Sequence, residues 1–192
     1  MDRIDAGWVD EVLDFWFGEL TREDWFTGGA ELDEKVRSRF LDLYQRLKAG
    51  FDERKVEDAR TALAAIIVFD QFPRNMFRNS AAAFATDDLA AGIARRAVER
   101  GWDTAGDKAA RPFYYMPFMH SEILADQERC VDLFRALGEG KEGEGDSLKY
   151  ALEHRDIVAR FGRFPHRNRA LGRESTADER EFMKEHAGYG QA

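Results

Sequence analysis

Apolar residues recur at three- and four-residue steps along most of this 192-residue chain, and no run alternates between apolar and polar residues. The first stripe consists of Val9, Val12, Leu13, Trp16 and Phe17. Such spacing places apolar side chains on one face of a helix, whereas a half-buried strand repeats every two residues. The pattern therefore predicts an all-α fold.

Seven to eight helices of ordinary length are expected, because glycine and proline stand where the stripes stop. Gly18 is placed to end the first helix, and Gly50 to close the second. A third helix, from about residue 57 to residue 69, is apolar nearly all round, which is typical of a buried central helix. Pro73 is expected to stop it, because proline removes a donor and clashes with the preceding turn.

The later part of the chain continues the helical pattern. Helices are expected over residues 87–100, 113–119, 122–137 and 147–161. Pro117 is expected to interrupt the second of these. A last helix starts after Thr176, because Thr176 and Glu179 have the spacing of a capping box. The segment 138–146 contains only glycine and charged residues, so we expect a flexible loop there, within a single domain over residues 1–192.

Composition excludes several classes of function. The longest unbroken apolar run, residues 62–69, is far too short to cross a bilayer. The formal net charge of −8 argues against nucleic-acid binding, which needs positive charge against phosphate. The single Cys130 cannot form an internal disulfide, and the N-terminus lacks the pattern of a secretory signal. We therefore expect a soluble cytoplasmic protein that binds neither nucleic acid nor membrane.

The strongest local bias is basic and lies between His154 and Arg173. Six arginines stand against a single acid there, Asp156, which gives a local formal charge of +5 in an acidic chain. The planar guanidinium fork binds a carboxylate or a phosphate at two points. The bias fits a site for a small anion, and it equally fits arginines that pair with surplus acids on neighbouring helices.

A carboxylate, Asp70, closes the most apolar of the expected helices. At the edge of the core it needs a partner, and an arginine of the following turn or of the basic segment is the natural one. That turn, Phe72-Pro73-Arg74-Asn75, is echoed by Phe164-Pro165-His166-Arg167-Asn168. Two copies do not make a repeat array, so the echo indicates an old duplication or the same turn used twice.

A third polar stretch is His120-Ser121-Glu122. Ser121 is placed to cap the next helix, with Glu122 in its first turn, where negative charge is favoured. Capping leaves His120 unexplained, and the alternative is that His120 and Glu122 form an acid/base pair or bind a metal. Because the histidines show no metal-ligand spacing, no metal is assigned, and the cofactor stays unknown.

Four motifs of this chain together resemble the bacterial domain of unknown function 924 family. They are Val12 to Gly18, Asp70 to Asn75, Pro117 to Glu122, and Arg160 to Asn168 with Leu171-Gly172-Arg173. The likeness covers roughly residues 9 to 182, and the motifs follow the family's order. The resemblance implies a tetratricopeptide-like superhelix in which antiparallel helix pairs stack. It implies no reaction.

Polar residues in and beside these motifs make up the candidate site. The candidate catalytic residues are His120, Glu122 and His166. The candidate ligand-binding residues are Asp70, Arg74, Asn75, Arg78, His154, Arg163, Arg167, Asn168 and Arg173. We expect them to converge in one pocket that binds a small anion, phosphate or carboxylate, where a histidine would serve as general acid/base for hydrolysis or transfer.

The alternative is a helical scaffold that grips an acidic peptide or a protein partner, with the polar cluster serving a structural role. The two interpretations differ in what removal of a cluster residue does. A ligand site loses binding and keeps its stability, whereas a structural network loses stability. The sequence leaves open whether the protein is an enzyme, and it assigns no oligomeric state.

Overall fold

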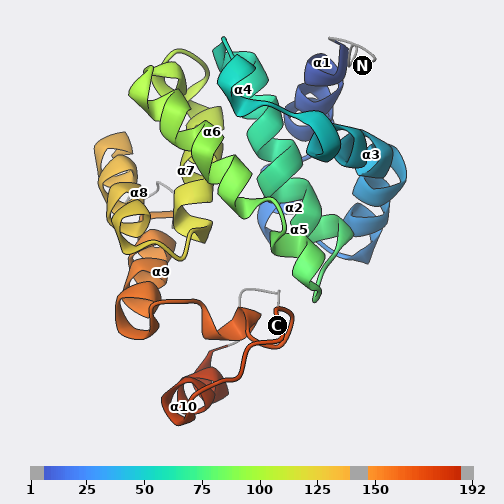
Figure 1. The fold of residues 1–192 in the computed structure, drawn as a ribbon. Helices are drawn as coiled ribbons and strands as arrows, with labels where there is room; N and C mark the ends of the chain where they lie inside the picture. Colours follow the sequence, from blue (N-terminus) through green and yellow to red (C-terminus); the bar gives the residue numbers. More distant parts are fainter. Residues whose placement is uncertain (1–6, 139–146, 187–192) are drawn as a thin grey trace. The chain divides into compact units, whose positions relative to one another are not determined.

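The structure, a computed structural model, describes residues 7–138 and 147–186, and every regular element in those ranges is a helix (Figure 1). Ten α-helices, α1 to α10, are joined by short 3-10 and π-helical segments, and no strand occurs in the described ranges. The prediction of an all-α fold is thereby confirmed, whereas the tetratricopeptide-like superhelix stays a prediction. No helix in the same ranges is long and apolar enough to cross a membrane.

The chain forms two compact units. Unit 1 contains residues 1–78 and 82–114, and unit 2 contains residues 79–81 and 115–192. The boundary falls inside α7 (Arg111–His120). The single domain expected from the sequence stays a prediction. The loop expected at 138–146 lies, except for Gly138, outside the described residues.

Unit 1 packs its helices around an aromatic core. Its complete helices are α1 (Gly7–Leu13), α2 (Arg22–Thr27), α3 (Ala30–Gly50), α4 (Ala59–Ile66), α5 (Phe72–Met76) and α6 (Asp87–Glu99). Helix α3 packs against α5, and α4 packs against α1 and α6. The ring of Phe72 stacks on that of Phe40 at a centroid distance of 4.6 Å and meets Trp16 edge-on at 5.8 Å. These contacts anchor α5 in the core.

Neither internal proline ends its helix, so both predicted stops are wrong. The chain passes from α4 through a π-helical segment, Ile67–Gln71, directly into α5. Pro73 lies in the first turn of α5, and the wider π turn shifts the hydrogen-bond register ahead of its ring. Pro117 lies inside α7, whose residues 113–119 are all buried and are held by packing on both sides of the proline.

Two further differences lie near the start of unit 1. A π-helical segment, Asp14–Glu19, continues α1 past Gly18, so Gly18 does not end the first helix. Phe15 and Trp16 within it are buried, and this packing overrides the weak stop signal of a glycine. Helix α2 was not expected, although Thr21 and Asp24 form a capping box at its start.

Unit 2 contains α8 (Leu124–Leu137), α9 (Ser147–Phe161), α10 (Ala177–Glu185) and the 3-10 turn η7 (Pro165–Arg167). Helix α8 packs against α9, and α10 packs against η7. The bounds of α9 are those predicted, and Thr176 and Glu179 form the predicted capping box of α10. The segment between α9 and α10, residues 162–176, carries four of the six arginines found between His154 and Arg173, and is called the basic loop.

Candidate functional site

Asp70 forms a buried structural ion pair in unit 1. Its side chain is fully buried, and Nη1 of Arg74 lies 3.2 Å from its Oδ1. The other arm of the guanidinium, Nη2, donates to Asp87 Oδ2 at 3.0 Å. Burial works to lower the pKa of Arg74, but the two carboxylates outweigh it and raise that pKa. The expectation that Asp70 pairs with a nearby arginine is confirmed.

Asn75 and Arg78 bind a second carboxylate in the same unit. Arg78 donates from Nε and Nη2 to the two oxygens of Asp33, at 2.9 and 2.8 Å. Asn75 Nδ2 donates to Asp33 Oδ1 at 2.9 Å. Because Asp33 belongs to α3, these bonds hold the end of α5 and the turn after it to that helix.

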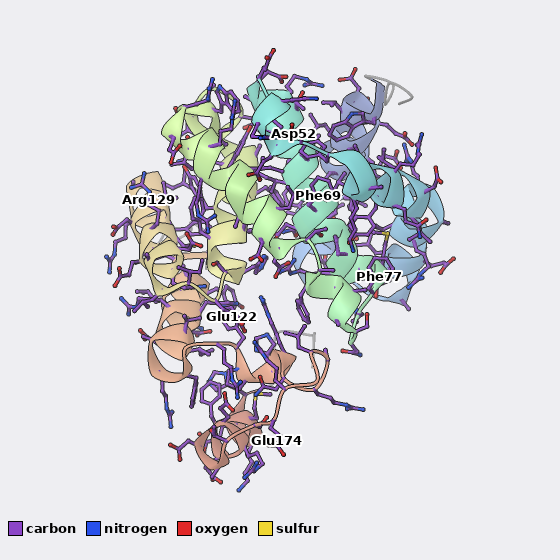
Figure 2. The ribbon with its side chains drawn as sticks, viewed as in Figure 1. Asp52, Phe69, Phe77, Glu122, Arg129 and Glu174 are labelled. Atoms are coloured by element: carbon purple, nitrogen blue, oxygen red, sulfur yellow. The ribbon has the colours of Figure 1, made fainter. Side chains whose placement is uncertain are left out.

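Glu122 clamps the basic loop in unit 2. Its Oε1 accepts from the backbone amide of Phe164 at 2.8 Å and from Arg173 Nη2 at 2.9 Å, and Arg173 Nη1 donates to Oε2 at 2.7 Å. Figure 2 labels Glu122 beside the turn that follows α7, and Glu174 in the basic loop. Burial works to raise the pKa of Glu122, but the hydrogen bonds from Arg173 and Phe164 outweigh it and lower that pKa.

Glu179 is the second carboxylate that organises the basic loop. Its two oxygens accept from Arg163 Nε and Nη2 at 2.7 and 2.9 Å, and the Thr176 amide donates to Oε2 at 2.7 Å. Asn168 Nδ2 also donates to Oε2, at 3.3 Å. The hydrogen bonds from Arg163 lower the pKa of Glu179 to about 2, against the opposing effect of burial. Arg163 and Arg173 therefore each make a two-point bond to a carboxylate of this chain.

Three of the remaining basic candidates gather around the ring of Phe164, which is fully buried. The Arg167 guanidinium lies 4.5 Å from its centroid, and the rings of His154 and His166 each lie 5.4 Å from it. His120, at the end of α7, has its ring 6.5 Å from that of His154. His154, His166 and Arg167 are buried, whereas His120 is partly exposed. We call His120, His154, His166 and Arg167 the imidazole–guanidinium cluster.

The pKa of His154 reflects its burial and the basic groups around it. Burial is the largest cause that lowers the pKa of His154, to about 3, and the positive influence of His120, His166 and Arg167 lowers it further. The ring is therefore neutral at neutral pH. Its Nδ1 lies 2.8 Å from the carbonyl oxygen of Tyr150, one turn earlier in α9.

The expected cap of α8 is wrong. Ser121 is not the cap of α8, which begins at Leu124 with Ile123 as its N-cap. Ser121 Oγ instead donates to Asp126 Oδ2 at 2.6 Å and accepts from the Ile123 amide, because the turn is two residues longer than expected. Cys130 is fully buried, and burial raises the pKa of its thiol, as suits a core cysteine.

The candidate residues divide between the two units. Asp70, Arg74, Asn75 and Arg78 belong to unit 1. Unit 2 contains His120, Glu122, His154, Arg163, His166, Arg167, Asn168 and Arg173. Within unit 2 the structure brings the histidines and Arg167 together, and the convergence of all twelve in one pocket stays a prediction. In the described ranges, no group of three or more His, Cys, Asp or Glu side chains is arranged to hold a metal ion.

Several residues of these networks were missed by the sequence reasoning. Asp33 and Asp87 bind the arginines of unit 1, and nothing in their spacing marks them. Glu179 was interpreted only as a capping residue, although a capping glutamate is well placed to bind a cation as well. The sequence marks Phe164 only as part of the echoed turn, and its role as the centre of the cluster depends on the tertiary fold.

Comparisons place the chain among bacterial proteins. A family model described as bacterial protein of unknown function, DUF924, matches residues 12–187. A solved structure of a protein of unknown function from Agrobacterium tumefaciens is similar, with 40% sequence identity and a TM-score of 0.82. The similarity covers 94% of this chain and 99% of that chain. The comparison with curated proteins gives no match.

Proposed function

Because the chain belongs to the DUF924 family of bacterial proteins of unknown function, its role is inferred from the site itself, and we propose that unit 2 binds a small anion. The ligand group is a phosphate or a carboxylate. It binds at the imidazole–guanidinium cluster, with Arg167 and the histidines as its partners. No reaction is assigned, and His120 is the residue best placed to exchange a proton with a ligand.

The observation that supports this proposal is that Arg167, His154 and His166 gather around the buried ring of Phe164. The pKa of the buried His154 is lowered by its basic neighbours from α7 and η7 as well as by burial. Positive groups that gather in a region of low dielectric attract an anion more strongly than the same groups in water. The guanidinium of Arg167 adds the forked donor geometry that suits phosphate and carboxylate oxygens.

The arginines of the basic loop divide into two roles. Arg163 and Arg173 hold the loop in place through Glu179 and Glu122. Arg167 belongs to the cluster and lies over the ring of Phe164. His120 is the partly exposed member of the cluster and therefore gives a ligand access from solvent. We expect the loop arginines to position the cluster, and Arg167 to contact the ligand.

A thermal-shift titration of the full chain with inorganic phosphate and with acetate tests the proposal. At about 100 times its dissociation constant a ligand stabilises the folded state by about 2.7 kcal/mol, which corresponds to a rise in Tm of about 5–10 °C for a chain of this size. Arg167→Met keeps a side chain of similar length without its charge and is expected to abolish the shift. Arg169→Met is the matched control, because Arg169 is exposed and stands two residues away.

The outcomes separate the two interpretations. A shift in the wild-type protein and in Arg169→Met, absent in Arg167→Met, supports the anion site. If Arg167→Met does not fold, His120→Gln gives the same test at a partly exposed position. No shift with either anion in the wild-type protein contradicts the proposal. The cluster would then be a structural network, and an acidic peptide would be the next ligand to titrate.

A further inference from the structure

An exposed arginine, Arg160, lies over two aromatic rings where the end of α9 contacts α10. Its guanidinium carbon is 4.6 Å from the ring centroid of Phe161 and 5.8 Å from that of Phe182. Both rings are half-buried and pack against the hydrophobic core of unit 2, and the ring of His186 stacks on Phe182 at 4.1 Å. We call Arg160, Phe161 and Phe182 the Arg160–aromatic cluster.

The arginines between His154 and Arg173 differ in whether this chain supplies a carboxylate for them. Three of them pair with carboxylates of the chain, namely Arg155, Arg163 and Arg173. Arg160 and Arg169 are exposed, and within residues 7–138 and 147–186 neither guanidinium makes a hydrogen bond or an ion pair. Nearest in sequence to the Arg160–aromatic cluster are Asp156 and Glu181, and each already pairs with a basic residue of its own helix.

The chemistry of this surface favours an acidic protein segment as its partner. Residues 157–173 contain five arginines and neither aspartate nor glutamate, so the charge complement has to come from outside this stretch. A guanidinium that lies over aromatic rings still presents the N–H groups at its edge, which bind a carboxylate at two points. Arginine and aromatic side chains are also enriched in protein–protein interfaces, whereas a small molecule prefers an enclosed site.

We propose that the Arg160–aromatic cluster binds an acidic peptide segment of a protein partner. A glutamate or aspartate of that segment pairs with Arg160, and a neighbouring apolar side chain covers the half-buried rings of Phe161 and Phe182. The surface includes neither Arg167 nor the histidines of the imidazole–guanidinium cluster. The inference is therefore independent of the anion site proposed above.

Fluorescence anisotropy of the full chain with two short labelled peptides tests the inference. In the first peptide glutamate and leucine alternate, and in the second peptide glutamine replaces every glutamate. Because a carboxylate forms a charge-assisted bond with a guanidinium and an amide does not, we expect the Kd of the glutamate peptide to be at least about tenfold lower. Analytical ultracentrifugation of the protein alone shows whether a second copy of the chain occupies this surface instead.

Three variants locate the binding. Arg160→Met keeps a side chain of similar length without its charge, and it is expected to raise the Kd of the glutamate peptide about tenfold. Arg169→Met is the matched control, because it removes an equally exposed and unpaired charge that, in the described ranges, does not lie over an aromatic ring. It is expected to bind the peptide as the wild-type protein does. Phe182→Leu keeps an apolar contact and removes one ring, so we expect the Kd to rise by about two- to fivefold.

Several outcomes would overturn the inference. They are no binding of the glutamate peptide, equal binding of the two peptides, and equal weakening by Arg160→Met and Arg169→Met, which would indicate a general effect of positive charge. A dimer of the wild-type protein that Arg160→Met dissociates would make a second copy the occupant. If Arg167→Met weakens peptide binding and Arg160→Met does not, the peptide binds at the imidazole–guanidinium cluster. The thermal shift with phosphate is expected to stay unchanged in Arg160→Met, so this inference and the anion site succeed or fail separately.

Discussion

The two aromatic-proline turns, one in each unit, share phenylalanine, proline, arginine and asparagine in the same order and are built differently. In unit 1, Pro73 lies within a helix, and Arg74 binds the carboxylates of Asp70 and Asp87. In unit 2, Pro165 begins a 3-10 turn, and Arg167 lies over the ring of Phe164. A shared motif therefore gives a buried ion pair in one unit and a cluster of basic groups in the other.

The residue four positions before each arginine explains much of this difference. For Arg74 it is Asp70, and a helical backbone places residues four apart on one face, so the pair forms. For Arg167 it is Arg163, which has the same charge and binds Glu179 instead. One acid in the preceding turn thus separates a structural arginine from one that is a candidate for ligand binding.

The largest expected effect comes from removal of the acid in unit 1. Asp70→Ala removes a fully buried carboxylate and leaves the largely buried Arg74 with one carboxylate fewer, and we expect it to lower the free energy of unfolding by about 3–5 kcal/mol. Urea denaturation measures this change. Asp42→Ala is the control, since Asp42 belongs to an exposed pair on α3 and should change the stability little. A loss as small as that of the control would show that Asp70 has no structural role.

The two asparagines of the turns offer a direct comparison. Asn168 is buried and contacts Arg173, Ser175 and Glu179, whereas Asn75 is half-buried and contacts Asp33. We expect Asn168→Ala to cost about 2–3 kcal/mol and Asn75→Ala about 1 kcal/mol, because more buried polar groups lose a partner in unit 2. Thermal denaturation of both variants tests the order. Equal losses of stability in the two variants would contradict the expectation that Asn168 contributes more than Asn75.

The smallest expected effect, for a change of one pH unit, is a dependence of stability on pH that His154 carries in unit 2; the matching turn of unit 1, residues 70–78, contains no histidine. In the unfolded chain the pKa of His154 is about 6.5, and in the folded protein it is lowered to about 3. Between these values the unfolded chain binds more protons, so stability falls as the pH falls, by roughly 1 kcal/mol per pH unit.

His154→Gln removes this titration. We expect the slope of unfolding free energy against pH to flatten in the variant between about pH 6.5 and about pH 4. Denaturation measured at several pH values in that range compares the variant with the wild-type protein. If the slope of unfolding free energy against pH is the same in both proteins, the pKa of His154 is not lowered in the folded protein.

Local sequence patterns predict the local structure of this chain well. The apolar stripe and the glycine-rich segment before it predict the bounds of α9 correctly, and the capping residues predict the start of α10. Each of these signals acts within a few residues. The pairing of Asp70 with a nearby arginine follows from its place at the end of an apolar helix. The proline stops fail, because packing of Phe72 and of the α7 side chains outweighs the local preference of proline.

The site is less predictable, because its contacts join distant parts of the chain. Glu122 and Arg173 are 51 residues apart, and Arg78 and Asp33 are 45 residues apart. Composition identifies the basic segment but not which arginine meets a carboxylate. Only the fold shows that Arg163 and Arg173 are held by glutamates and that Arg167 lies with the histidines around Phe164.

Glu179 couples the local unfolding of α10 to that of the basic loop. One carboxylate bonds the Thr176 amide at the start of the helix and the guanidinium of Arg163 in the loop. Opening of the first turn of α10 therefore breaks the support of the loop in the same step. Amide hydrogens of both segments should exchange with solvent together, as one cooperative unit. Binding of an anion at the proposed site and fraying of α10 are then expected to be coupled equilibria.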